Sequence, residues 1–247
     1  MSSNLCQTRF GNEHGHQDPD LSILHEKPNA MKQKEVFLLG EGDAWFRRNA
    51  DALLQRGLPE SDSLLMEILG LWQDLPARDG VRVLEVGCGP GARLAWLQNN
   101  MGFDCHGIDP SAEAVEVAVS GGVKAQIGTA DKLPYEKHAF DVVIFGFCLY
   151  LCDREDLFNI AAEADRILKN PGWLLIKDFY SPMPVARQYH HKAGINTYKM
   201  DYRKLFLWNP DYHLFSHRVT HHENDCYTDA PQEWVATSVL RKCTPLW

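Results

Sequence analysis

Three closely spaced glycines, Gly87, Gly89 and Gly91, are the residues of this sequence whose type and spacing best suit ligand binding. They follow the acid Glu85 and an apolar run over residues 81 to 86, whose β-branched residues predict a buried strand. Glycines after a strand let the backbone turn tightly and come close to a ligand. A helix is predicted directly after them, and its first turn has free N–H groups. The loop is therefore a candidate binding site.

The same loop also satisfies a second pattern. From Gly87 through Gly89 to Ala92 it matches the Gly-x-Gly-x-x-Ala fingerprint of dinucleotide-binding proteins, so a nicotinamide dehydrogenase is an alternative interpretation. The helix predicted over about residues 92 to 99 fits both interpretations. Cys88 is interpreted as a small filler of the loop, because nothing around it indicates metal or nucleophilic chemistry.

Residues at the ends of three further predicted strands help to decide whether the loop belongs to a nicotinamide dehydrogenase or to another kind of binding protein. These strands are expected over residues 103 to 108, 123 to 127 and 140 to 147. The first is followed by an aspartate, whose carboxylate can accept hydrogen bonds from both hydroxyls of a ribose. The notable residues at the three ends are Asp109, Pro110, Ala130, Asp131, Phe145, Gly146 and Phe147.

Together with the glycine loop, these residues resemble the motifs of the class I S-adenosylmethionine (SAM) dependent methyltransferases, over about residues 80 to 180. The resemblance implies that Asp109 binds the ribose of S-adenosyl-L-methionine and that Asp131 binds its adenine amino group. It implies a cofactor-binding set of Glu85, Gly87, Cys88, Gly89, Gly91, Asp109, Pro110, Ala130, Asp131, Phe145, Gly146 and Phe147. Simpler roles stay open: the glycines as turn formers, Asp109 as a helix cap and Asp131 as a solvated loop acid.

The order of the predicted elements gives the fold class. Strands and helices alternate between residues 80 and 180, which implies a parallel sheet covered on both faces. Strands predicted over residues 212 to 220 and 233 to 240 have no helix between them, so they pair most simply as an antiparallel hairpin. We therefore predict an α/β fold with a Rossmann-like, doubly wound, seven-stranded sheet. It is mostly parallel, ends in an antiparallel hairpin and carries helices on both faces.

The domain organisation is predicted from changes in periodicity. Residues 1–33 are polar without a sustained period and are expected to form an irregular arm, and residues 34–247 a single SAM-dependent methyltransferase domain. Helices within residues 34–79 are expected to act as a lid, and residues 180–211 as a substrate-cap insertion without regular structure. The phrase over residues 40–49 also resembles the opening of methyltransferases encoded with bacterial surface-glycan and pseudaminic-acid genes.

Composition limits the partners. With 25 Lys+Arg against 33 Asp+Glu, the formal charge of -8 leaves little material for a basic face, so nucleic acid is disfavoured. No apolar run approaches the ~20 residues that cross a bilayer, and no secretory signal begins the chain, so a cytoplasmic location is expected. The seven cysteines are expected to be free thiols. No metal is predicted from the spacing of His14 and His16, or of His221 and His222 with Cys226.

The insertion indicates the chemistry of the methyl acceptor. Tyrosines and titratable side chains crowd into residues 180–211, which is typical of a loop that recognises a ligand. A polar small molecule, such as a sugar, a nucleotide-sugar or another metabolite methylated on O or N, would suit it. His190 and His191 are candidate bases, because an imidazole pKa of about 6.5 suits the removal of a hydroxyl proton. Tyr150, after the fourth strand, is the rival.

Two other functions stay open. A methyltransferase of this class can act on a protein or a nucleic acid, and a SAM-fold protein can serve as a binding partner without methyl transfer. Intact acid and glycine positions indicate cofactor binding but do not distinguish these functions from small-molecule methylation. The oligomeric state is not indicated by the sequence.

Overall fold

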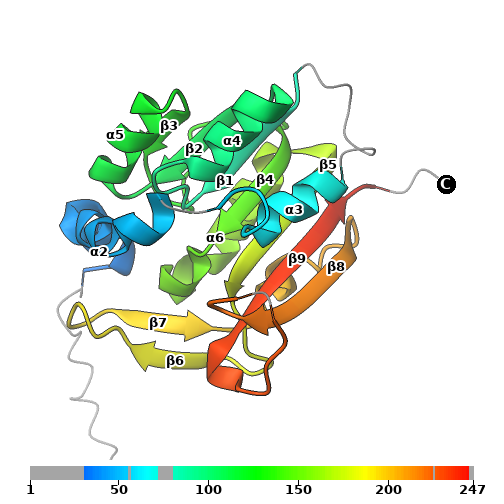
Figure 1. Ribbon diagram of the computed structural model, residues 1–247. Coiled ribbons are helices and arrows are strands. Elements are labelled where there is room, and N and C mark those ends of the chain that lie inside the picture. The colour runs from blue at the N-terminus through cyan, green and yellow to red at the C-terminus, as the bar shows by residue number, and fades with distance from the viewer. Residues whose placement is uncertain (1–30, 55–56, 72–79, 225, 245–247) are drawn as a thin grey trace, which may run out of the picture. The chain divides into compact units, whose positions relative to one another are not determined.

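Seven strands form one sheet within residues Lys32–Trp247 of the computed structural model. The structure describes residues 31–54, 57–71, 80–224 and 226–244. The strand order is β3-β2-β1-β4-β5-β9-β8; β1 to β5 are parallel, and β9 pairs antiparallel with β5 and β8 (Figure 1). The strands are β1 Arg82–Val86, β2 Asp104–Asp109, β3 Lys124–Ile127, β4 Phe140–Gly146, β5 Leu168–Phe179, β8 Tyr212–His221 and β9 Trp234–Lys242. The predicted sheet and its closing hairpin are confirmed.

Alternate residues of the central strands face two apolar cores. Val83 and Val142 pack with residues of α3, α4 and α5, whereas Leu84 and Val143 pack with residues of α6. Figure 1 shows α3 and α4 across one face of the sheet. The helices are α3 Ser63–Gly70, α4 Ala92–Met101, α5 Ala112–Ser120 and α6 Leu157–Ile167. Helices therefore cover both faces, as predicted. Of the helices in the described residues, none is both long and apolar enough to cross a membrane.

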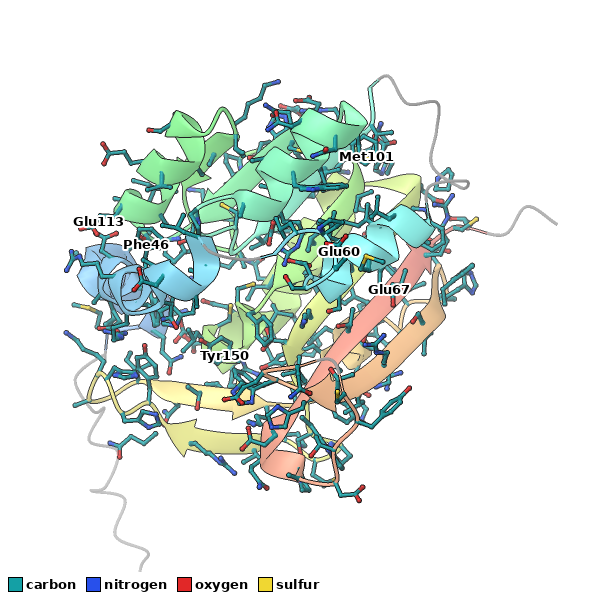
Figure 2. All side chains as sticks on the ribbon, in the orientation of Figure 1. Phe46, Glu60, Glu67, Met101, Glu113 and Tyr150 are labelled. Atoms are coloured by element: carbon teal, nitrogen blue, oxygen red, sulfur yellow. The ribbon has the colours of Figure 1, made fainter. Side chains whose placement is uncertain are left out.

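The N-terminal helices are held next to the carboxyl end of β2. α1 Gln33–Val36 leads through a wider turn at Phe37–Glu41 into α2 Gly42–Leu54. Asp43 accepts a hydrogen bond from the Ser111 hydroxyl at 2.7 Å, and Arg47 pairs with Glu113 of α5, which Figure 2 shows beside α2. These contacts fix α2 against the start of α5. Most of the arm predicted over residues 1–33, and the end of the predicted lid region, lie outside the described residues.

The insertion differs from its prediction. Residues 180–211 were expected to lack strands, but β6 Val185–Gln188 and β7 Asn196–Lys199 form an antiparallel pair, followed by a 3₁₀ turn at Tyr202–Leu205. The four residues of β6 are all exposed, so no face of this strand needs apolar residues and the alternation that marks a half-buried strand is missing. Figure 1 shows this hairpin, in yellow, beside the connection between β8 and β9.

Candidate functional site

A cavity of about 490 Å³ lies where β1, β2 and β4 end. Its walls come from the loops after these three strands, from the inner side of α2, from the turn after β3, and from the end of β5. Ligand sites of parallel α/β sheets lie in this position, outside the carboxyl ends of the strands. The volume is within the range of small-molecule sites, ~300–1,000 Å³.

The glycine loop forms one wall and is held against β2. The Gly87 amide donates to the Ile108 carbonyl at 2.8 Å, and the Gly89 amide donates to Asp109 Oδ2 at 2.8 Å. Gly87 has φ +75°, and a Cβ there would lie 2.6 Å from the Cβ of Cys148. Only glycine therefore fits this position without a shift of the loop after β4.

Asp109 is the carboxylate at the centre of this wall. Its Oδ1 accepts a hydrogen bond from the Ser111 amide at 2.9 Å, so it also fixes the turn that leads into α5. Burial raises the pKa of Asp109 to about 6, against the opposing effect of the hydrogen bonds from Ser111 and Gly89. Each carboxylate oxygen has a second acceptor site, so a bound ligand with hydroxyl donors would stabilise the ionised form.

A buried ion-pair network lies behind the glycine loop. Arg93 of α4 pairs with Glu85, and its Nη2 lies 2.8 Å from Asp62 Oδ2. Asp62 also caps α3 by accepting a hydrogen bond from the Leu65 amide at 3.0 Å. The network therefore ties β1, α3 and α4 together under the cavity. The sequence analysis singled out Glu85 and missed Arg93 and Asp62, which no local motif marks.

Asp131 is engaged by a lysine of α1. Lys34 Nζ donates to the Asp131 carboxylate and lies 2.7 Å from Asp156 Oδ2. Burial raises the pKa of Asp131, but the hydrogen bonds from Lys34 and Thr129 and the charge of Lys34 together outweigh it, so the pKa lies below its ordinary value. This end of the cavity is therefore acidic, and its charge is partly balanced by Lys34.

Aromatic side chains line the other end. The ring centroid of Phe179, at the end of β5, lies 5.0 Å from that of Tyr150 and 5.5 Å from that of Phe147. The Tyr150 hydroxyl accepts a hydrogen bond from Trp45 Nε1 of α2 at 3.1 Å. In Figure 2, Tyr150 lies between α2 and the β6–β7 hairpin. Burial, and the nearby Asp178, raise the pKa of Tyr150 well above its ordinary value. The phenol therefore stays protonated at neutral pH.

Most of the residues predicted for the site meet at this cavity. Tyr150 lines it, as do ten of the twelve residues predicted to bind the cofactor. These ten are Glu85, Gly87, Cys88, Gly89, Asp109, Pro110, Ala130, Asp131, Gly146 and Phe147. Gly91 does not line the cavity and is the N-cap residue of α4, with φ +72°. Phe145 is fully buried in the apolar core beside Phe206, because the alternation of β4 turns it away from the cavity.

His190 and His191 are placed on the surface. Both are exposed in the turn between β6 and β7 and do not line the cavity. Their neighbour Tyr189 is buried and its hydroxyl accepts a hydrogen bond from Arg48 at 2.7 Å, which anchors the turn and leaves the two histidines outside. Their assignment as bases stays a prediction that this placement does not support.

The connection from β8 to β9 adds residues that sequence reasoning did not assign. His222 lines the cavity, and Glu233 lies 2.7 Å from its Nδ1. One ring nitrogen of each of His221 and His222 and a carboxylate oxygen of Glu233 lie within 4.8 Å of one another. The sequence analysis considered the two histidines only with Cys226 and predicted no metal there. Glu233 has no motif around it, and only the pairing of β8 with β9 brings it here.

Comparison with known proteins places this geometry among methyltransferases. The family described as "Methyltransferase domain" matches residues 84–176. The uncharacterised methyltransferase YcgJ of Bacillus subtilis is 34% identical over 109 residues, which cover 41% of this chain and 42% of that protein. Norajmaline N-methyltransferase of Rauvolfia serpentina is 33% identical over 109 residues, covering 38% and 37%. The chain thus spans less than half the length of these curated relatives.

A solved structure extends the likeness of fold. The 1,6-didemethyltoxoflavin-N1-methyltransferase of Burkholderia thailandensis, solved with 1,6-didemethyltoxoflavin and S-adenosylhomocysteine bound, matches with a TM-score of 0.63 at 15% identity. The match covers 89% of this chain and 93% of that protein. At 15% identity the likeness concerns the fold alone. Because it covers 89% of this chain, it extends beyond residues 84–176, which the family matches.

Proposed function

Because the chain belongs to the class I SAM-dependent methyltransferases, we propose that it transfers the methyl group of SAM to an oxygen or nitrogen of a polar small molecule. A sugar, a nucleotide-sugar or another hydroxylated metabolite fits this description. The observation that carries the proposal is the bond between Asp109 and the amide of Gly89, inside a cavity at the carboxyl ends of the strands.

The residues present fit SAM. Asp109 offers free acceptor sites to the two ribose hydroxyls, and Gly87 and Gly89, which have no side chains, line the same wall. Ala130 and Asp131 would hold the adenine, with Asp131 as acceptor for its amino group. When bound, SAM supplies an electrophilic methyl group on a positively charged sulfur.

The chain itself must position the acceptor and exclude water. The aromatic part of the cavity, with Phe147, Tyr150 and Phe179 where β4 and β5 end, is suited to bind the acceptor. Trp45 and Asn49 of α2 line the same cavity, so α2 is placed to cover it. A protonated Tyr150 can donate a hydrogen bond to the acceptor.

Binding and turnover test the proposal separately. Calorimetry should detect binding of SAM and S-adenosylhomocysteine but not of NAD. Asp109→Ala removes two hydrogen bonds to a charged acceptor, each worth about 1.5–3 kcal/mol, so SAM affinity should fall at least tenfold. Asp51→Ala, on the exposed side of α2, is the matched control.

Turnover should be followed as conversion of SAM to S-adenosylhomocysteine over sugars, nucleotide-sugars, phenols and heterocyclic amines. Binding of NAD by the wild type, or unchanged SAM affinity in Asp109→Ala, contradicts the cofactor assignment. SAM binding without turnover on any small molecule, but with turnover on a protein or RNA extract, contradicts the acceptor assignment. SAM binding with no turnover at all supports a binding protein instead.

A further inference from the structure

The pairing of β8 with β9 places a carboxylate against a histidine at the cavity. His221 is opposite Trp234 in the register of the two strands, so the residues just beyond them, His222 and Glu233, meet where the strands end. His222 Nδ1 lies 2.7 Å from Glu233 Oε2. This contact joins residues that are far apart in the sequence and needs the hairpin to be formed.

The 2.7 Å contact turns Nδ1 of His222 toward the Glu233 carboxylate and leaves Nε2 on the other side of the ring. In a neutral imidazole whose proton lies on Nδ1, beside this carboxylate, Nε2 is unprotonated and can accept a proton. Glu223 Oε1 lies 3.9 Å from Nε2, beyond hydrogen-bond distance. His222 lines the cavity and is 36% exposed, so it lies at the mouth and is open to a ligand there.

The neighbours of His222 describe the ligand that fits. The ring centroid of Phe179 is 6.2 Å from that of His222, 5.0 Å from that of Tyr150 and 5.5 Å from that of Phe147. Aromatic side chains favour a flat, unsaturated partner, through offset or edge-to-face contacts worth about 0.5–1.5 kcal/mol per pair. The acceptor end of the cavity is therefore an aromatic wall with one proton acceptor beside it.

We infer that the methyl acceptor binds as a planar unsaturated ring against Phe179 and that His222, oriented by Glu233, removes the proton from the hydroxyl or ring N–H being methylated. This inference rests on the proposed methyl transfer. The acceptor atom forms a bond to the methyl carbon while the carbon–sulfur bond breaks. The bonding pair stays on sulfur, which becomes neutral, and the acceptor's proton passes to Nε2 of His222.

Other candidate bases are less well placed. Tyr150 is a protonated phenol whose hydroxyl already accepts a hydrogen bond from Trp45. His190 and His191 are exposed and outside the cavity. Glu233 acts through His222 and is a positioning residue, since its carboxylate fixes the ring orientation and the tautomer.

A first experiment examines the histidine without any turnover. In protein labelled with ¹⁵N-histidine, the His222 resonances, assigned with His222→Gln, should show the Nδ1–H tautomer. Glu233→Gln should redistribute His222 between the two tautomers, whereas His213→Asn, on an exposed part of β8, should leave it unchanged. An Nε2–H tautomer in the wild type overturns the inference.

A second experiment measures ring binding in the presence of S-adenosylhomocysteine, again without turnover. The probes are 7-hydroxy-4-methylcoumarin and 8-hydroxyquinoline, with methyl α-D-glucoside as the non-planar comparison, and binding is followed by saturation-transfer NMR. The two planar probes should bind, and Phe179→Ala should weaken them at least fivefold. Preference for the glucoside, or unchanged planar-probe binding in Phe179→Ala, overturns the inference.

A third experiment measures turnover with whichever probe the wild type methylates. His222→Gln should lower kcat by about 10²–10⁴-fold while the Kd for SAM and the probe KM stay within a few-fold. Added imidazole should restore part of the turnover of His222→Ala. The inference is overturned if His222→Gln turns over as fast as the wild type. It is also overturned if His190→Asn or His191→Asn loses as much turnover, or if turnover requires added Zn²⁺ and is lost with EDTA. If the wild type methylates nothing, the proposed function fails, and the tautomer and ring-binding results still decide this inference.

Discussion

Asp109 Oδ2 accepts a hydrogen bond from the Gly89 amide at 2.8 Å, which joins the end of β2 to the loop after β1. The same carboxylate accepts the Ser111 amide, so one side chain orders both strand ends that border the cavity. Because these two hydrogen bonds use one acceptor site on each oxygen, the carboxylate can order the loop and still bind a ligand. This double role makes its protonation state important for affinity.

The pH dependence of SAM binding follows from Asp109. Its pKa in the free protein is about 6, raised mainly by burial, and ribose hydroxyls favour the ionised form. SAM affinity should therefore be constant above pH 7 and fall below pH 6, by up to about tenfold per pH unit, because binding must then release a proton. Calorimetry between pH 5 and pH 8 checks this. Asp109→Asn should bind weakly with little pH dependence, and an unchanged slope in this variant assigns the titration to another group.

Asp178 should stabilise the turn that carries Tyr150. Its buried carboxylate accepts hydrogen bonds from the amides of Phe179 at 2.7 Å and Leu149 at 2.8 Å. An amide at this position has one acceptor oxygen, so Asp178→Asn leaves an N–H donor facing a backbone donor and should lower the free energy of unfolding by about 1–3 kcal/mol. Urea unfolding measures this, with the exposed Asp229→Asn as the control.

The effect of Asp178 should also depend on pH. Burial raises its pKa to about 7 in the folded protein, from 3.8 in the unfolded chain. The folded state thus binds the proton more tightly, and the stability that the protonated group contributes is complete below pH 3.8 and lost as the pH rises through 7. The difference in unfolding free energy between wild type and Asp178→Asn should shrink from pH 5 to pH 8. A difference that grows over this range contradicts the assignment.

Gly146 should tolerate no side chain. A Cβ at this position would lie 2.7 Å from Glu85 Oε1 and 3.1 Å from Arg93 Nη1, both buried. Gly146→Ala must therefore displace the ion pair, at a cost of about 1–3 kcal/mol. Gly70→Ala, at the end of α3 with nothing within 4 Å of the new Cβ, should be neutral or slightly stabilising. Differential scanning calorimetry compares the two, and equal melting temperatures would contradict the crowding.

The sequence predicts the parts of the site that are local. Asp109 and the glycine loop each end a strand, so the alternation of strands and helices places them on one edge of the sheet before any contact is known. Two pairs in the site join distant elements, and no spacing in the sequence predicts that their members meet. These pairs are Lys34 with Asp131 and His222 with Glu233. Their identification needs the positions of α1 and of the β8–β9 hairpin.

Two departures have local physical reasons. Phe145 follows the two-residue period of β4 into the apolar core, while Phe147 leaves the strand with φ +56° and lines the cavity. The prediction treated both as ligand contacts because the motif contains both. The hairpin β6–β7 was missed because β6 is exposed on both faces and β7 is partly buried throughout, so neither strand needs apolar alternation.

The last prediction concerns α2 as a lid. Trp45 lines the cavity and donates to the Tyr150 hydroxyl, while the adjacent Phe46 is buried, as expected for neighbouring residues on different sides of a helix. The segment Gly42–Leu54 also has polar contacts, with the start of α5 through Asp43 and Arg47 and with Tyr189 through Arg48. Such a helix gains little from burial alone, so a ligand that fills the cavity beneath Trp45 should hold it in place.

Limited proteolysis within Gly42–Leu54 should be at least severalfold slower with saturating SAM. In Trp45→Ala the protection should be largely lost although SAM binds, whereas Met66→Ala, exposed on α3, should be protected like the wild type. Equal cleavage of the wild type with and without SAM means that α2 is a fixed wall of the cavity and not a lid.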